Sequence, residues 1–247
     1  MRELLTNLGN GLLDLLAPPA CWRCHESVAD GKVLCRSCAD LLTNDPNPVC
    51  ERCASTLAPA MAAANVCPRC LMKTFVYDAV VRLAPYDEPH RAIILEWKRP
   101  SGEVMAEALA PLFGRHLAPK LTPFGPQVAV PVPLHWRRRW RRGYNQSEVL
   151  ARAVAGALQI PMAPDALRRV KNTEFQSKQK ADERKANVRG AFAPGRKVGL
   201  AGKVVVLVDD VLTTGATANE ASRVLKQCGA KAVIVAVVAH ETPRNPG

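Results

Sequence analysis

Two adjacent carboxylates and a short run of small hydroxyl residues stand between an apolar segment and a helical segment. Asp209 and Asp210 follow the apolar run 204–208, and the small residues after them are Thr213, Thr214, Gly215, Ala216 and Thr217. Adjacent carboxylates can accept hydrogen bonds from a vicinal diol or approach a hydrated Mg²⁺. Backbone N–H groups of a tight loop at a helix N-terminus bind anions, and phosphate suits them best. Together these residues predict a site for a ribose 5-phosphate.

Other phosphate-binding loops do not fit this pattern. A Walker loop needs a lysine directly after its last glycine, and Gly215 is followed by alanine. The dinucleotide-binding pattern G-x-G-x-x-G does not occur in the chain either. One alternative stays open, an ordinary strand, turn and helix with solvated aspartates.

The flanking segments predict how these residues are held. The run 204–208 is apolar and mostly β-branched, as in a parallel strand that is buried on both faces. Thr217 and Glu220 have the spacing of a capping box, and apolar positions at helical spacing continue to Cys228. We therefore expect the carboxylates at the carboxyl end of a central strand and the hydroxyl residues at the start of a helix.

A second polar segment follows another predicted strand, at residues 127–132. Proline ends a strand, so a loop begins at the run Pro131, Val132, Pro133 and Leu134. The next residues, HWRRRWRRGYNQ, interleave arginines with two tryptophans. Arginines such as Arg137 and Arg142 can grip a pyrophosphate through bidentate contacts. A nucleic-acid patch, in which arginine holds the backbone and tryptophan stacks on bases, and a solvated basic surface both stay open as alternatives.

Eight of the nine cysteines form four C-x-x-C pairs. Two such pairs can complete one tetrahedral zinc site, so we expect two structural zinc ions. Sequential pairing gives one site from Cys21, Cys24, Cys35 and Cys38, and a second from Cys50, Cys53, Cys67 and Cys70. A cross-braced pairing stays open. A disulfide framework and a redox role are alternatives, although we expect no export signal and the pairs come as a set.

Composition and charge bound the class of protein. The net charge of +12 over 247 residues implies an anionic ligand, whether a phosphate-rich substrate, a nucleic acid or an acidic partner. The first residues favour a short amphipathic helix over a signal peptide because Asp14 splits the leucines, and no segment approaches a membrane span. We expect a cytoplasmic protein with an amphipathic helix (1–20), a double zinc ribbon (21–74) and an α/β domain (75–247).

The order of elements predicts the fold. Strands are expected at 76–83, 128–132, 203–208 and 232–239, with helices between them, which together give a parallel α/β sheet. The helices are expected at 89–97, at 103–117, from Asn145 to Leu158 and from Thr217 to Cys228. The stretch 168–190 has almost no apolar residues and is typical of a mobile functional loop.

The motif VVLVDDVLTTGAT (205–217) resembles the phosphoribosyl pyrophosphate (PRPP) signature of the type I phosphoribosyltransferases. The rest of the chain resembles the ComF family. In that family V-P-V-P-L precedes arginines and R-G-[FY]-N-Q, which correspond here to 130–134 and 142–146. The family spacing T-x-x-Q…E-R-x-x-N-V is similar to the pattern that contains Thr173, Gln176, Arg184 and Asn187.

The resemblance implies a type I phosphoribosyltransferase core that uses PRPP and Mg²⁺, with an acceptor that no residue identifies. Asp209 and Asp210 would be catalytic, 213–217 would bind the 5-phosphate, and the loop 131–134 with Arg137 and Arg142 would bind pyrophosphate. Residues of the polar stretch would form a lid over the active site. The family's association with natural competence implies an alternative, a non-catalytic accessory protein in DNA uptake that binds PRPP, single-stranded DNA or competence proteins.

Overall fold

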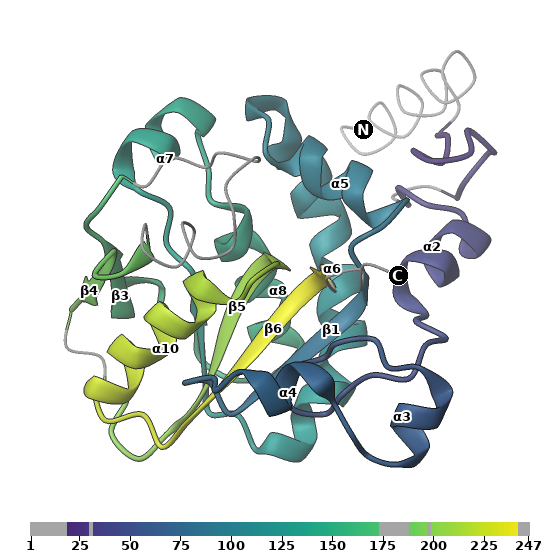
Figure 1. Cartoon of the computed structure of the whole chain (residues 1–247). Helices are drawn as coiled ribbons and strands as arrows, with labels where there is room; N and C mark the ends of the chain where they lie inside the picture. Colours follow the sequence, from purple (N-terminus) through teal and green to yellow (C-terminus); the bar gives the residue numbers. More distant parts are fainter. Residues whose placement is uncertain (1–18, 30–31, 173–187, 197–198, 242–247) are drawn as a thin grey trace. The chain divides into compact units, whose positions relative to one another are not determined.

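A parallel sheet forms the centre of the computed structural model, which describes residues 19–29, 32–172, 188–196 and 199–241 (Figure 1). Its four strands lie in the order β1-β6-β5-β2. They are β1 (Ala79–Pro85), β2 (Val128–Pro131), β5 (Val204–Leu212) and β6 (Ala232–His240). Each pairing in this sheet is parallel. The predicted α/β class with a parallel sheet is confirmed.

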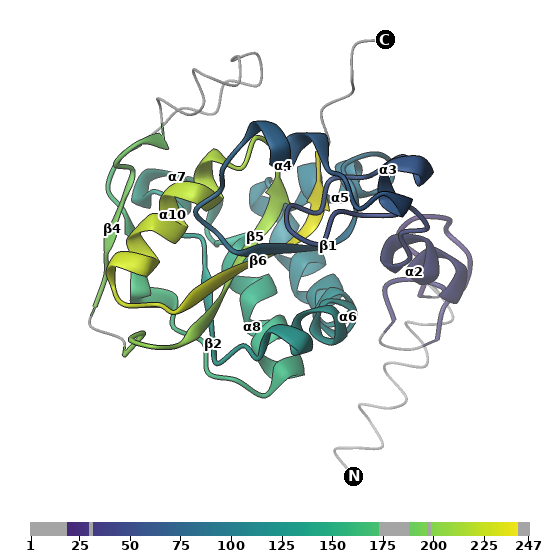
Figure 2. The ribbon, with the colours of Figure 1, turned by 60° about the horizontal axis from the view of Figure 1, so that its bottom comes forward.

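Helices cover both faces of this sheet (Figure 2). On one face α6 (Glu103–Leu121) and α8 (Gln146–Leu158) pack against each other and the strands, and α10 (Ala216–Gln227) lies on the other. A Cβ atom at Gly114 of α6 would lie 2.7 Å from the carbonyl of Ala153 in α8. This position therefore needs glycine for the two helices to approach closely. Together the two layers of helices bury the sheet between them.

The remaining elements are short. They are α2 (Arg36–Thr43), α3 (Pro59–Ala63), α4 (Pro68–Met72), α5 (His90–Trp97), α7 (Trp136–Arg142), the 3₁₀ turns Pro100–Gly102, Thr122–Phe124 and Pro164–Ala166, and the strands β3 (Leu167–Arg169) and β4 (Phe192–Pro194). β3 and β4 pair antiparallel in a separate sheet of two strands. The sequence did not predict this pair or α7. No helix in the described part of the chain has the length and apolar character needed to cross a membrane.

The chain forms two compact units, residues 1–44 and 45–247. The second cysteine cluster belongs to the unit that contains the sheet. Cys53, Phe75 and Tyr77 are buried in one apolar core with Val224 of α10 and Val235 of β6. The predicted division into three parts, with boundaries after residues 20 and 74, stays a prediction. The helix predicted at 1–20 lies almost wholly outside the described residues.

Candidate functional site

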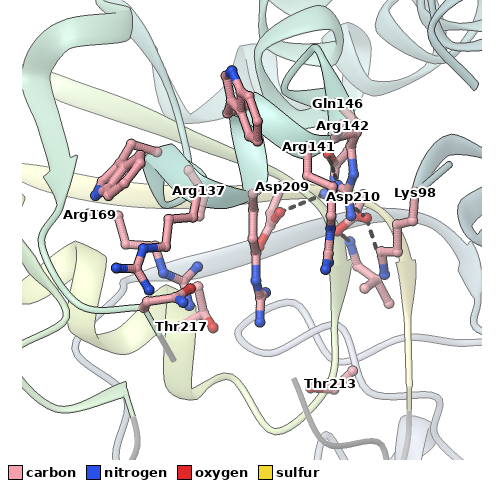
Figure 3. Close-up of a pocket in the computed structure, with 16 residues that line it drawn as sticks. Lys98, Arg137, Arg141, Arg142, Gln146, Arg169, Asp209, Asp210, Thr213 and Thr217 are labelled. Atoms are coloured by element: carbon pink, nitrogen blue, oxygen red, sulfur yellow. Dashed lines mark hydrogen bonds and ion pairs between the residues drawn. The ribbon is translucent and has the colours of Figure 1, made fainter. Parts of the chain in front are cut away.

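The two aspartates lie inside β5. The sequence predicted them just beyond the strand, but β5 stays paired with β6 as far as Leu212. Asp210 is 4% exposed. Its Oδ2 atom lies 3.3 Å from Nζ of Lys98 and accepts a 3.2 Å hydrogen bond from Nε2 of Gln146 (Figure 3). Asp209 accepts a 2.8 Å hydrogen bond from Oγ of Ser147. The start of α8 therefore holds both carboxylates.

The two carboxyl groups differ in their ionisation. Burial raises the pKa of Asp209, and the charge on Asp210 raises it further. Burial alone would raise the pKa of Asp210 as well, but the Lys98 ammonium and the Gln146 hydrogen bond outweigh it and lower that pKa. Asp210 is therefore the carboxylate that ionises first. A cation or a hydroxyl donor that approaches Asp209 would favour its ionised form too.

The hydroxyl-rich loop joins β5 to α10. Gly215 is the N-cap residue of α10 and has φ +83°, a backbone conformation that favours glycine. The predicted capping box between Thr217 and Glu220 is wrong, since α10 has no side-chain cap. Glu220 instead accepts hydrogen bonds from the backbone N–H of Gly190, at 2.7 Å, and from Arg223 one turn further along.

A cavity of about 820 Å³ lies over these residues (Figure 3). Its lining brings together several of the predicted site residues with others, namely Lys98, Val132, Trp136, Arg137, Arg138, Trp140, Arg141, Arg142, Gln146, Arg169, Asn172, Asp209, Asp210, Val211, Thr213 and Thr217. Pro131, Pro133, Leu134 and Gly215 are not part of this lining. Thr214 and Ala216 line a second cavity of about 800 Å³ instead. The predicted lid residues Thr173, Gln176, Arg184 and Asn187 lie outside the described residues.

Cationic side chains outnumber the carboxylates in this cavity. Lys98, Arg169 and four arginines of α7 line it with the two aspartates. Burial lowers the pKa of Arg142 and of Arg169, and the guanidinium of Arg169 lies 5.4 Å from the centre of the Phe192 ring. Such a positive surface suits phosphate and pyrophosphate groups.

Sequence reasoning assigned no role to Lys98 or Arg169. The available signal for Arg169 was its place directly after Leu167-Arg168, at the point where an apolar residue gives way to the polar stretch. The signal for Lys98 was its place at the end of the helix predicted at 89–97.

The cysteines form two groups with the geometry of metal sites. Cys21, Cys24, Cys35 and Cys38 form one group and Cys50, Cys53, Cys67 and Cys70 the other, and within each group the sulfur atoms lie within 4.8 Å of one another. Distances between sulfur atoms of 3.5, 3.6 and 3.8 Å occur in these groups. A Zn–S bond of about 2.3 Å in a tetrahedron places the sulfur atoms about 3.8 Å apart. Both groups fit a structural zinc ion, and the sequential pairing is confirmed.

The parallel sheet, the loop before α10 and the two cysteine groups define a phosphoribosyltransferase-like protein with zinc ribbons. Residues 145–245 match the phosphoribosyl transferase domain, and residues 12–71 match the double zinc ribbon domain. These matches agree with the class that the fold and the motifs indicate.

Similarity to known proteins extends over most of the chain. The DNA utilization protein YhgH of Escherichia coli (strain K12) is 32% identical over 90% of this chain and 96% of its own length. Competence protein F of Haemophilus influenzae is 33% identical over 82% of this chain and 88% of its own. Competence protein ComFC of Bacillus subtilis is 26% identical over 86% of each chain. The chain belongs to the ComF family.

Proposed function

We propose that this protein is a phosphoribosyltransferase that binds PRPP with Mg²⁺ and transfers ribose 5-phosphate to an acceptor. One observation carries the proposal: Asp209, Asp210, Thr213 and Thr217 line a single cavity together with a cluster of lysine and arginine side chains. The carboxylates suit the ribose hydroxyls of PRPP, the threonine loop suits its 5-phosphate, and the cationic side chains suit its pyrophosphate. The acceptor is not specified by these residues.

Each part of the cavity has one task in this proposal. The bond from the ribose carbon to pyrophosphate breaks, its electron pair leaves with pyrophosphate, and a lone pair of the acceptor forms the new bond and loses a proton. The carboxylates of Asp209 and Asp210 bind the ribose hydroxyls and stabilise the positive charge that develops on the ribose carbon. Arg137 and Arg142 bind the leaving pyrophosphate. Asp209 and Asp210 would hold Mg²⁺ together with phosphate oxygens of the ligand, and the ion would neutralise part of the leaving charge.

Exchange of both aspartates for asparagine (Asp209→Asn with Asp210→Asn) is expected to weaken PRPP binding at least about 100-fold. The variant loses charge-assisted hydrogen bonds that contribute about 1.5–3 kcal/mol each. Calorimetric titration with PRPP and Mg²⁺ measures the change. Asp165→Asn is the control, because that side chain is 68% exposed and lies 4.0 Å from Arg196 at the surface. Equal affinities of the wild type and the double variant would reject the site.

A second function is favoured by the tryptophans of α7. Trp136 and Trp140 are 66% and 87% exposed, and the same short helix carries five arginines. Exposed indoles beside guanidinium groups suit the bases and backbone of a single-stranded nucleic acid. The names of the relatives, which refer to DNA utilization and competence, support this second role. We propose it as an accessory function in DNA uptake, performed in the cytoplasm together with competence proteins.

The double variant Trp136→Ala with Trp140→Ala is expected to bind single-stranded DNA at least about tenfold more weakly, since stacking contributes about 1–3 kcal/mol per base. Gel-shift titrations at low and high salt measure this, and affinity should fall steeply with salt because phosphate contacts dominate. Phe124→Ala is the control, an exposed aromatic residue that does not line the cavity. No shift of wild-type protein at low salt would exclude a direct DNA role.

A further inference from the structure

One arginine of the second zinc ribbon reaches the phosphate loop. Arg69 stands between Cys67 and Cys70, and its Nη2 atom donates to the backbone carbonyls of Thr213, at 3.3 Å, and Thr214, at 3.2 Å. All of these residues belong to the compact unit 45–247. The hydrogen bonds therefore connect a C-x-x-C pair of the second zinc ribbon to the segment that follows the two aspartates.

The geometry of the peptide bond gives these contacts a consequence. In a planar trans peptide the carbonyl and the following N–H point in opposite directions. Fixing the carbonyls of Thr213 and Thr214 on Arg69 therefore directs the N–H groups of Thr214 and Gly215 away from the guanidinium. Arg69 is not part of the lining of the main cavity, whereas the loop residues Thr213 and Thr217 are. Arg69 thus fixes the orientation of these two peptide groups from the side of the loop that carries their carbonyls.

The guanidinium is itself held from several sides. Its Nη1 atom contacts Nε2 of His240 and lies 3.4 Å from Oγ of Ser55. The Cζ atom of Arg69 lies 5.2 Å from the centre of the Phe75 ring. His240 is fully buried, and its Nδ1 atom is 2.9 Å from the carbonyl of Ala54. Burial lowers the pKa of His240 to about 3, so the ring is neutral and Nε2 can accept from Arg69.

The loop also rests on this part of the protein by packing. A Cβ atom at Gly215 would lie 3.1 Å from the hydroxyl of Tyr77 and 3.5 Å from Nη2 of Arg69. Tyr77 is 1% exposed and shares the core with Cys53. The loop therefore packs against Arg69 of the second ribbon and against Tyr77, which lies in the same core as Cys53 of that ribbon.

We propose that Arg69 is a positioning residue for the phosphate loop, and that through it the metal-bound second ribbon sets the affinity for the ribose 5-phosphate end of the ligand. This inference rests on the proposed function. It assigns to the ribbon a task in ligand binding in addition to its contribution to folding. Pyrophosphate binding, which uses the arginines of α7, should not depend on Arg69.

The ribbon supplies its own control. Arg52 occupies the corresponding place in the Cys50–Cys53 knuckle, two residues after the first cysteine, and it is exposed. Arg52→Met changes the charge and size of a knuckle arginine without touching the loop. Arg69→Met removes the donors to Thr213 and Thr214, while Arg69→Lys keeps the charge and one donor group.

The test measures two ligands separately, ribose 5-phosphate and inorganic pyrophosphate, by calorimetric titration of zinc-loaded full-length protein. Arg69→Met is expected to raise the Kd of ribose 5-phosphate at least about tenfold, or about 1.4 kcal/mol. The Kd of pyrophosphate and the zinc content should stay within about twofold of the wild type, and Arg52→Met should leave both Kd values unchanged. Arg69→Lys should recover part of the affinity for ribose 5-phosphate. If Arg69→Met does not fold, the Kd values of the two ligands for Arg69→Lys and for the wild type are compared instead.

Unchanged ribose 5-phosphate affinity in a folded Arg69 variant would overturn the role of Arg69 alone. An equal loss for both ligands would overturn it too, since that is the result of a general structural effect. Failure of the wild-type protein to bind ribose 5-phosphate would overturn the proposed function, and this inference with it. Because the wild type is measured first, the two failures are distinguishable.

Discussion

Loss of zinc from the second ribbon is expected to unfold the whole unit that contains the sheet. Cys53 is 0% exposed and Cys67 is 8% exposed, and both lie in the core that α10 and β6 share. Structural zinc ions contribute apparent binding energies of about 10–16 kcal/mol, whereas whole domains are stable by only about 5–15 kcal/mol. A Cys53→Ser, Cys67→Ser variant should therefore lose one zinc equivalent and its cooperative melting transition, as measured by metal analysis and circular dichroism.

The first ribbon provides the matched comparison. A Cys21→Ser, Cys38→Ser variant should also lose one zinc equivalent but keep the cooperative transition, because these cysteines belong to the other compact unit. Cys228→Ser should keep both zinc ions, since Cys228 is in neither group. A second-ribbon variant that melts at the wild-type temperature would show that the sheet does not depend on the metal.

Replacement of Asp45 by alanine is expected to lower the free energy of unfolding by about 3–5 kcal/mol, the usual cost of leaving one member of a buried ion pair uncompensated. The side chains of Arg82 in β1 and of Asp45 are 1% and 5% exposed, and Nη2 of Arg82 lies 2.9 Å from Oδ2 of Asp45. Burial lowers the pKa of Arg82, and Asp45 opposes that effect. Without Asp45 the charge of Arg82 would remain buried, with the hydroxyl of Thr56 as a neutral hydrogen-bond partner at 2.7 Å.

Urea unfolding measures the effect as a shift of the midpoint at constant slope. The control is Asp165→Ala, which removes an exposed pair with Arg196 and should change stability by less than about 0.5 kcal/mol. A loss below about 1 kcal/mol for Asp45→Ala would mean that Arg82 finds another anionic partner or water.

The sequence predicted those parts of the fold that depend on the residue types and spacing within a short segment. The run 204–208 identifies a buried strand by its apolar β-branched residues, and each C-x-x-C pair identifies half of a metal site by spacing alone. The parallel sheet follows from the alternation of such strands with helices. None of these predictions needed a contact between distant residues.

The parts that sequence did not predict depend on distant contacts or lack an apolar period. Helix α7 has no buried residue, so no apolar stripe marks it. The guanidinium of Arg169 lies against the ring of Phe192, which belongs to a strand that follows the polar stretch. The spacing of Thr217 and Glu220 predicts a cap, but Glu220 accepts hydrogen bonds from the distant Gly190 and from Arg223 instead. The contact from Arg69 to Thr213 and Thr214 likewise joins segments at opposite ends of the unit.

The pairing of β1 with β6 has a consequence for synthesis of the chain. Ala79 of β1 lies opposite Ile234 of β6 in this pairing. The strand β1, which follows the second ribbon in sequence, therefore cannot enter the sheet until β6 has been synthesised. A ribosome adds about 5–20 residues per second, and pairings between distant residues form slowly. The thiols of the second ribbon therefore spend several seconds outside their final core. During that interval the thiols lack the protection from oxidation and misassembly that burial in the core gives.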